Sequence, residues 1–246
     1  MMLSVIIPVR NERDTILQVI ERVRAVDAGM PKQIIVVDGA STDGTRERVE
    51  SALGSDVTPI WEDAPRGKGA AVLAGLARAQ GALVVIQDAD LELDPGEFPR
   101  LLEPIVAGRA DAVLGVRFAG GRGATPWPGY LGNRALSSFA SLLFFRRLND
   151  ILTAHKMMRT EVARALPLTC RGFDLDAEIA CRLVRAGYRV LELPVDYRPR
   201  GRDEGKKLGF SAGWGVLRAI VRVRLEGRPP LVPRDQPSAE PPPAIE

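Results

Sequence analysis

The chain has very few of the residues that build the commonest metal and redox sites. It contains a single histidine, His155, and two cysteines, Cys170 and Cys181, which form no CxxC pair. A zinc site usually needs four Cys or His ligands, so this composition argues against one. Without a candidate partner, His155 is interpreted as a structural residue. Sparse cysteine is also typical of proteins that reside in a reducing cytoplasm.

Aromatic residues and net charge are also low. Phe, Trp and Tyr make up 5% of the chain, and 34 basic against 31 acidic residues leave a net charge of +3. Stacking surfaces for single-stranded nucleic acids need aromatic side chains, and duplex binders carry a strong basic field. We therefore expect no nucleic-acid partner.

Long apolar runs are missing as well. No stretch reaches the roughly 18 residues of a membrane-spanning helix, and residues 1–8 lack the basic region of a signal peptide. A hydrophobic content of 46% with 26% charged residues is typical of a globular protein with a full core. The expected location is the cytoplasm, either free or peripheral on the inner face of the membrane.

The first half of the chain alternates short β-branched runs with helical periodicity. The patterns predict strands at 3–8, 33–38, 58–61 and 82–87, and helices at 15–26, 45–53 and 69–80. This alternation is typical of an α/β domain, in which a mostly parallel sheet carries helices on both faces.

The second half is predicted to be more irregular. We expect a helix at 98–106, a strand at 112–116, a Gly- and Pro-rich loop at 118–132, helices at 133–145 and 174–186, a strand at 189–197 and a basic amphipathic helix at 210–225. Residues 228–246 are Pro-rich and have no core-forming pattern, so we predict a disordered tail.

Polar and acidic residues follow three of the predicted strands. Asn11 and Glu12 follow the first strand, Asp38 ends the second, and Asp88 and Asp90 follow the strand that ends at residue 87. One such residue often only caps the next helix. Since ligands of open parallel sheets bind beyond the carboxyl ends of the strands, three clusters on one edge indicate a site.

The Asp88-Ala89-Asp90 segment is the sharpest of these features. Two carboxylates at positions i and i+2 can reach one hard cation, and Mg²⁺ or Mn²⁺ prefers such oxygen ligands while leaving room for phosphate. The alternative is a solvated acidic loop, since Glu92 and Asp94 follow. The buried run that precedes Asp88 favours the metal site.

Residues 66–69, Arg-Gly-Lys-Gly, lie at the start of a predicted helix. The glycines would let an anion approach the backbone closely, and Lys68 and the helix N-terminus would supply positive charge. The spacing is not that of a P-loop. A flexible surface turn is the other interpretation.

The ordered motifs of the chain resemble the family 2 glycosyltransferases, and within them the dolichyl-phosphate mannosyltransferase branch, which includes bacterial polyprenyl-phosphate glycosyltransferases. In the first half the resemblance is carried by residues 6–12, 36–38, 41–45, 67–71 and 88–90. In the second half it is carried by residues 127–128, 132–134, 185–190, 192–195 and 204–209. The resemblance extends from about residue 3 to about residue 225.

The resemblance implies a GT-A fold with a Rossmann-like, mostly parallel central sheet flanked by helices. It implies one domain over residues 1–227, followed by the tail at 228–246. Within the domain, residues 1–116 would bind the nucleotide sugar and residues 117–227 would form the acceptor half.

The resemblance also implies roles for individual residues. The nucleoside would contact Pro8, Arg10, Glu12 and Asp38. The diphosphate and a Mg²⁺ or Mn²⁺ ion would be held by Lys68, Asp88, Ala89 and Asp90, with Glu92 as a further metal ligand where relatives often carry Gln. Arg117, Arg134 and Ser138 would face the acceptor phosphate, and Arg202 and Lys207 would close over the sugar donor.

Three departures from the family pattern stand out. Gly39 replaces a second Asp, which leaves the identity of the nucleotide open. Residues 152–158 differ from the Ser-Gly-Phe or Cys-Tyr-Lys pattern of relatives, which leaves the acceptor open. The hydrophobic segments that usually follow the catalytic domain are also absent from this sequence.

Several functions therefore stand side by side. The first is an inverting hexosyltransferase that uses polyprenyl phosphate, an anion that needs no general base. The second transfers to a hydroxyl of a small molecule or carrier-bound metabolite, and needs a base such as Asp176 or Glu178. The third is a non-catalytic nucleotide-sugar-binding protein, against which the Asp88/Asp90 pair argues. Helix 210–225 could lie on an anionic membrane or pack on the core.

Overall fold

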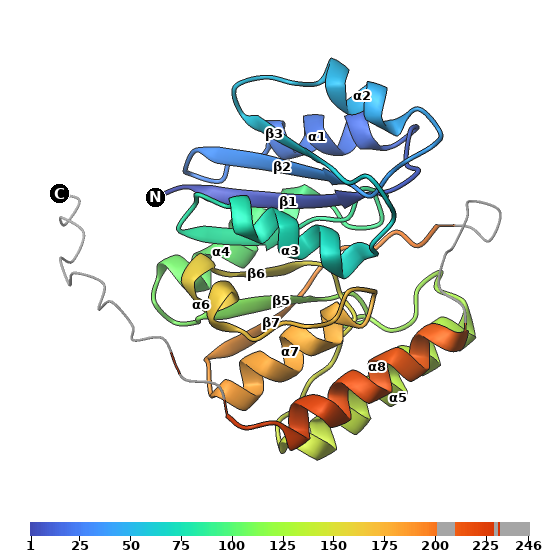
Figure 1. The fold of residues 1–246 in the computed structure, drawn as a ribbon. Coiled ribbons are helices and arrows are strands. Elements are labelled where there is room, and N and C mark those ends of the chain that lie inside the picture. The colour runs from blue at the N-terminus through green and yellow to red at the C-terminus, as the bar shows by residue number, and fades with distance from the viewer. Residues whose placement is uncertain (201–209, 229–230, 232–246) are drawn as a thin grey trace, which may run out of the picture.

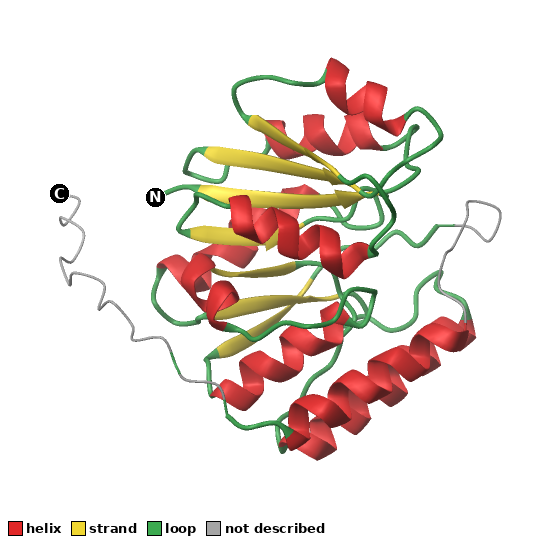
Figure 2. Cartoon of the chain, in the orientation of Figure 1, coloured by secondary structure: helices red, strands yellow, loops and turns green. Residues whose placement is uncertain are grey.

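The computed structural model describes residues 1–200 and 210–228, and residue 231. Its centre is a seven-stranded sheet in the order β3-β2-β1-β4-β6-β5-β7 (Figure 1). The strands are β1 Leu3–Val9, β2 Lys32–Asp38, β3 Val57–Trp61, β4 Leu83–Ile86, β5 Ala112–Val116, β6 Lys156–Arg159 and β7 Val190–Pro194. Helices cover both faces of this sheet (Figure 2), which confirms the predicted α/β class.

The helices follow the predicted positions closely in the first half. They are α1 Ile16–Ala25, α2 Thr45–Ser51, α3 Lys68–Arg78, η1 Pro95–Glu97, α4 Phe98–Val106, α5 Trp127–Phe144, α6 Thr160–Ala165, α7 Leu175–Ala186 and α8 Phe210–Leu225. Among the described helices, none combines the length and apolar character needed to cross a membrane.

Alternate side chains of the strands enter two cores, one on each face of the sheet. Val5 and Ile7 of β1 pack on the side of α1 and α4, while Ile6 packs on the side of α3 and α7. A Cβ at Gly75 of α3 would come within 2.5 Å of the Ile6 side chain. Glycine at this position therefore lets the helix lie directly on the strand, which fixes where its N-terminus meets the sheet edge.

Strands β3, β2, β1 and β4 are parallel neighbours, as predicted. The sequence patterns did not reveal β6, which runs antiparallel between β4 and β5. Its four residues, Lys-Met-Met-Arg, have no β-branched member and begin with a lysine whose side chain is fully buried. The short helix α6 that follows was missed as well.

The predicted loop at 118–132 is wrong in its last part, because α5 begins at Trp127. Pro128 stands in the first helical turn, where a residue without a backbone N–H is tolerated because no helical hydrogen bond is lost there. Of the predicted tail at 228–246, all but residues 228 and 231 lie outside the described part of the chain.

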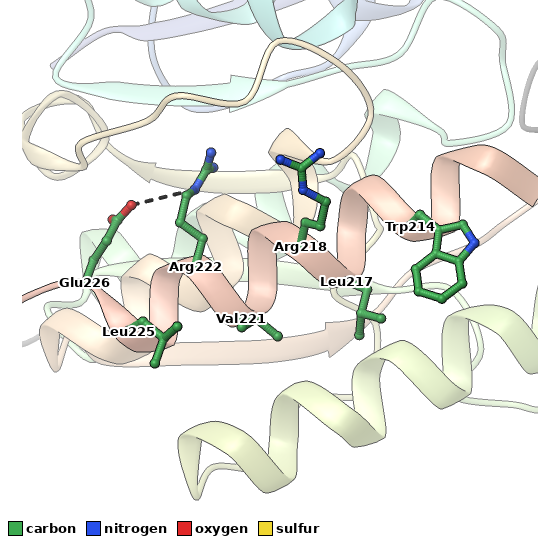
Figure 3. Close-up of a pocket in the computed structure, with 7 residues that line it drawn as sticks. All are labelled: Trp214, Leu217, Arg218, Val221, Arg222, Leu225 and Glu226. Atoms are coloured by element: carbon green, nitrogen blue, oxygen red, sulfur yellow. Dashed lines mark ion pairs between the residues drawn. The ribbon is translucent and has the colours of Figure 1, made fainter.

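Helix α8 lies beside α5 and α7 at one end of the molecule (Figure 1). Val216, Ile220 and Val223 are buried against that core, so the interpretation of a helix packed on the core is correct for one face. On the other face Trp214 is 70% and Leu225 80% exposed, and Figure 3 shows Trp214, Leu217, Val221 and Leu225 along the helix with Arg218 and Arg222.

Candidate active site

The carboxyl ends of β1, β2 and β4 meet at one edge of the sheet, as the strand predictions required. β1 lies between the other two, and Val9 is paired with Asp38 in register. In the loops that follow these three strands, Asn11, Ala40 and Leu91 adopt φ values of 55°, 57° and 61°. Non-glycine residues rarely adopt this left-handed conformation, and such strain tends to gather at functional sites.

Lys68 joins two carboxylates across this edge. Its Nζ lies 2.8 Å from Oδ1 of Asp88 and 3.1 Å from Oδ2 of Asp176. Burial lowers the pKa of Lys68, but Asp176 and Asp88 outweigh this effect and raise the pKa above its ordinary value. The lysine is therefore a fixed positive charge beside the Asp88-Ala89-Asp90 turn.

The glycines that flank Lys68 serve a different purpose from the one predicted. A Cβ at Gly67 or Gly69 would come within 2.5 or 2.7 Å of the backbone of residues 170–171. The Ala70 amide also donates to the carbonyl of Arg171. The backbone of residues 170–171 therefore occupies the space beside this helix N-terminus that the prediction gave to an anion. The positive charge that remains for a ligand is that of Lys68.

Asp88 and Asp90 form a strained pair of like charges. Burial, and after it the charges of Asp88 and Glu92, raise the pKa of Asp90 to about 7, although the Glu92 amide and Arg200 act in the opposite direction. Both aspartates remain partly exposed, so a ligand can reach them. A divalent cation fits this donor set, because two hard oxygen ligands that repel each other are stabilised by positive charge between them.

Glu92, the predicted third metal ligand, is engaged by two other groups. Its two oxygens accept hydrogen bonds from the Tyr197 hydroxyl (3.0 Å) and the Arg200 amide (2.9 Å). Within the described part of the chain, no three Asp, Glu, His or Cys side chains form a group that could hold a metal ion. Asp88 and Asp90 are therefore the stronger candidates as metal ligands, and the role of Glu92 stays a prediction.

A buried hydrogen-bond chain beneath the turn shapes its backbone. The Gln87 side-chain amide donates to the carbonyls of Asp88 and Leu93, so its oxygen must accept from Nε2 of His155 at 2.8 Å. Burial lowers the pKa of His155 to about 3, so the ring is neutral. His155 is structural, as predicted, but through a partner that the sequence did not reveal.

Asp176 and Glu178, the two predicted bases, occupy different surroundings. Asp176 is buried between Lys68 and Lys156, and these lysines outweigh burial and hold its pKa below the usual value. Glu178 accepts hydrogen bonds from the amides of residues 169 and 170 and from Arg182 and Arg222. Glu178 therefore braces α7 against α8, and its prediction as a base is wrong.

The predicted nucleoside contacts lie at the ends of β1 and β2. Pro8 is buried within β1, and Arg10 is exposed directly after it. Glu12 pairs with Arg200 at 2.7 Å, which ties the segment after β7 to this edge. Asp38 is fully buried, and its Oδ2 accepts from the Ser41 amide at 3.3 Å.

The predicted acceptor residues do not form one cluster. The guanidinium of Arg117 makes a bidentate pair with Asp150, which Asn133 also binds. Arg117 therefore binds the loop before β6 through its guanidinium. This pairing does not support a direct contact of Arg117 with the acceptor phosphate. Arg134 and Ser138 are exposed on α5, one turn apart. Arg202 and Lys207 lie outside the described residues.

Residues 4–167 match the model of the family described as "Glycosyl transferase family 2". This match covers most of the chain and includes every strand end described above. The chain belongs to glycosyl transferase family 2.

Curated relatives of this glycosyltransferase agree with the resemblance found in the sequence. It is 31% identical to the dolichol-phosphate mannosyltransferase of Pyrococcus furiosus, over 91% of this chain and 64% of the relative, so it spans somewhat less than two thirds of that protein. It is also 31% identical to the undecaprenyl-phosphate mannosyltransferase of Micrococcus luteus, over 91% of this chain and 94% of the relative.

A solved structure confirms the GT-A fold. The glucosyl-3-phosphoglycerate synthase of Mycobacterium tuberculosis, in complex with Mn²⁺, UDP and glucosyl-3-phosphoglycerate, matches with a TM-score of 0.70. The alignment covers 90% of this chain and 79% of that one at 22% identity. At this identity the likeness establishes the fold alone.

Proposed function

We propose that this glycosyltransferase moves a hexose from a nucleotide sugar to a polyprenyl phosphate, with inversion at the anomeric carbon. The single observation that carries the proposal is the convergence of Asp38, Asp88 and Asp90 with Lys68 on one sheet edge. Two relatives whose names specify a prenyl-phosphate acceptor support the choice of acceptor.

In the proposed reaction, a phosphate oxygen of the acceptor attacks the anomeric carbon as the bond to the diphosphate breaks. The nucleoside diphosphate leaves with the bonding electron pair. Lys68 would bind a diphosphate oxygen, since its charge is held beside the Asp88 turn. Because the acceptor oxygen is already ionised at neutral pH, no side chain has to remove a proton.

Asp88 and Asp90 would hold a Mg²⁺ or Mn²⁺ ion. Such an ion would supply charge stabilisation for the departing diphosphate. Burial together with repulsion from Asp88 and Glu92 raises the pKa of Asp90 to about 7, and this need for a compensating positive charge is the feature of the site that supports the assignment.

The hydroxyl-acceptor alternative has weaker support. It needs a general base with a raised pKa close to the reacting hydroxyl. Asp176 has a lowered pKa and is bound by two lysines, and Glu178 belongs to the α7–α8 contact. Neither carboxylate is poised to accept a proton.

We further propose that the enzyme meets its acceptor at an anionic membrane through an α5–α8 face, defined by the exposed apolar residues of these neighbouring helices. These residues are Trp127, Leu131, Leu142, Phe145, Trp214, Val221 and Leu225. Arg218 and Arg222 flank the stripe on α8 (Figure 3). Arg222 is already paired with Glu178 and Glu226, so Arg218 carries the charge argument. A second copy of the chain would bring a like charge to this face, whereas anionic lipid complements Arg218.

An assay of the product tests the proposed reaction. The full chain is incubated with Mn²⁺, a panel of nucleotide hexoses, and either a polyprenyl phosphate or the corresponding polyprenol. We expect a lipid-linked hexose from the phosphate and none from the alcohol. Transfer to the polyprenol alone, or to neither acceptor with any sugar donor, would contradict the proposal.

A further inference from the structure

Lys156, the first residue of β6, is a fully buried lysine at the sheet edge that carries the site. Because β6 runs antiparallel to β4 and β5, its start lies beside their carboxyl ends. The Nζ of this lysine donates to the carbonyls of Ile151 and Thr153, in the loop before β6, and to Oδ1 of Asp176 on α7. An ammonium has three N–H donors, so these three acceptors use all of them.

Lys156 and Lys68 share one carboxylate. Asp176 gives Oδ1 to Lys156 at 3.3 Å and Oδ2 to Lys68 at 3.1 Å. The Nζ of Lys68 also lies 2.8 Å from Oδ1 of Asp88, so these two carboxylates leave it one N–H for a ligand. A row of alternating charges thus runs from the loop before β6 to the Asp88 turn. Of its two lysines, Lys68 has a partly exposed side chain and Lys156 does not.

The shared carboxylate makes the position of Lys68 depend on Lys156. A carboxylate can accept hydrogen bonds at both of its oxygens, and opposite charges attract strongly in a buried environment. Because Lys156 occupies Oδ1 of Asp176, only Oδ2 is left for Lys68. The Lys68 ammonium therefore stays between two carboxylates, where it also meets Asp88. Without Lys156, Asp176 could turn both oxygens to Lys68 and draw it away from the Asp88 turn.

We propose that Lys156 is a positioning residue for sugar transfer: it fixes the carboxylate of Asp176 and thereby holds the Lys68 ammonium where the donor diphosphate binds. The inference rests on the proposed function, in which Lys68 contacts a diphosphate oxygen. Lys156 itself touches no substrate, since its three N–H donors are taken by the chain. Negative charge develops on the diphosphate as its bond to the anomeric carbon breaks, so a displaced Lys68 ammonium stabilises the departing group less well.

Variants that remove the buried charges in balance separate positioning from stability. Lys156→Met, Asp176→Asn and the double variant are compared with the parent enzyme in denaturant titrations and in sugar transfer to polyprenyl phosphate. The double variant should unfold at a higher denaturant concentration than Asp176→Asn, because no buried ammonium is left unpaired. Its kcat should nevertheless stay about 10-fold or more below that of the parent, as in Lys156→Met. Recovery of kcat together with stability would give Lys156 a purely structural role and overturn the inference.

Calorimetric titration with Mn²⁺ and a nucleoside diphosphate, GDP and UDP in turn, tests the route through Lys68 without turnover. The double variant Lys156→Met/Asp176→Asn should bind the diphosphate about 10-fold more weakly than the parent. The same pair of changes in Lys68→Met should alter the affinity by less than about 2-fold, because residues that act through one another are not additive. Equal losses in the two backgrounds, or no loss in either, would overturn the inference. Failure of the parent to bind either nucleotide would instead contradict the proposed function.

Asp111→Asn is the matched control for the loss of a buried charge. Asp111 is fully buried and pairs with Arg159 and Arg189 just before β5, at the end of the sheet opposite the candidate site. This variant should unfold at a lower denaturant concentration and still bind the nucleoside diphosphate within about 2-fold of the parent. A 10-fold loss of affinity in Asp111→Asn would show that destabilisation alone weakens the site, and would overturn the inference.

Discussion

The sheet edge at β1, β2 and β4 and the α5–α8 face differ in nearly every physical property. The edge is built from buried charges whose positions depend on one another, as Lys68 bridges Asp88 and Asp176. The face is built from exposed apolar side chains such as Trp214 and Leu225, each of which could change without disturbing its neighbours. A reacting centre needs charges held in fixed positions, whereas contact with a membrane needs exposed apolar area. The two regions should therefore respond differently to substitution.

The largest expected effect is on folding, at the centre of the charged edge. Asp176→Asn leaves the fully buried Lys156 ammonium without its only carboxylate partner among the described residues. Removing one partner of a buried ion pair typically lowers the free energy of unfolding by about 3–5 kcal/mol. Denaturant titration should show this loss, whereas Glu161→Gln in the surface pair with Arg159 should cost under about 1 kcal/mol. If both variants lost less than about 1 kcal/mol of unfolding free energy, the charges of the sheet edge would not depend on one another.

Asp90→Asn should affect turnover and spare folding. It removes one of the two proposed cation ligands, and loss of a single electrostatic contact at a reacting centre commonly costs about 10²–10³ in kcat. It also removes a charge that is disfavoured by burial and by repulsion from Asp88 and Glu92, the causes that raise the pKa of Asp90, so stability at neutral pH should not fall. The turnover rate is measured as the release of nucleoside diphosphate from the sugar donor in the presence of Mn²⁺. Unchanged turnover and metal dependence would remove Asp90 from the site.

The matched control for that experiment is Asp27→Asn. Asp27 lies between α1 and β2, at the opposite edge of the sheet from the active site. Its substitution should leave turnover unchanged. A comparable loss in this variant would mean that the Asp90 effect is not specific to the proposed cation ligands.

The strand ends could be predicted from sequence because they depend on local patterns and on one topological rule. The buried runs before Asp38 and Asp88 mark strands, and parallel strands bring their carboxyl ends together. The remaining site contacts join residues that are distant in sequence. Lys68 and Asp176 are 108 positions apart, and Arg200 and Glu12 are 188 apart, so no local pattern relates them.

His155 illustrates the same limit on a smaller scale. Its partner Gln87 stands 68 positions away, directly after β4, where the sequence pattern indicates only the end of a buried strand. The strand β6 that brings the two together has no β pattern of its own. What the sequence could show was the absence of a second histidine and of a CxxC pair that could share a metal with His155, and that sufficed to interpret the residue as structural.

A smaller, pH-dependent effect should arise beneath the Asp88 turn. His155 is neutral in the folded protein because burial lowers its pKa to about 3, while in the unfolded chain it titrates near 6.5. Stability from this residue is therefore present above about pH 6.5 and is lost progressively as the pH falls below that value towards the pKa of the folded state. In His155→Phe this part of the acid dependence should be absent from denaturant titrations. An unchanged slope would contradict the assignment.

The smallest effect should be at the α5–α8 face. The double variant Trp214→Ser/Leu225→Ser removes two exposed side chains and should leave the free energy of unfolding within about 0.5 kcal/mol of the parent. Binding to vesicles that contain anionic lipid should weaken by about 10-fold or more, given roughly 1.5–3 kcal/mol for each large apolar side chain that is buried. Sedimentation of the protein with anionic and with neutral vesicles measures this binding. Equal binding of variant and parent would exclude this face.

The most direct test of the division between the two regions is turnover of the Trp214→Ser/Leu225→Ser variant with two forms of the acceptor. One is a short-chain prenyl phosphate dissolved in water, and the other is a long-chain polyprenyl phosphate held in anionic vesicles. We expect the variant to match the parent enzyme with the dissolved acceptor and to fall behind it with the vesicles, while Asp90→Asn loses turnover with both. An equal loss with both acceptors in the helix variant would contradict the account.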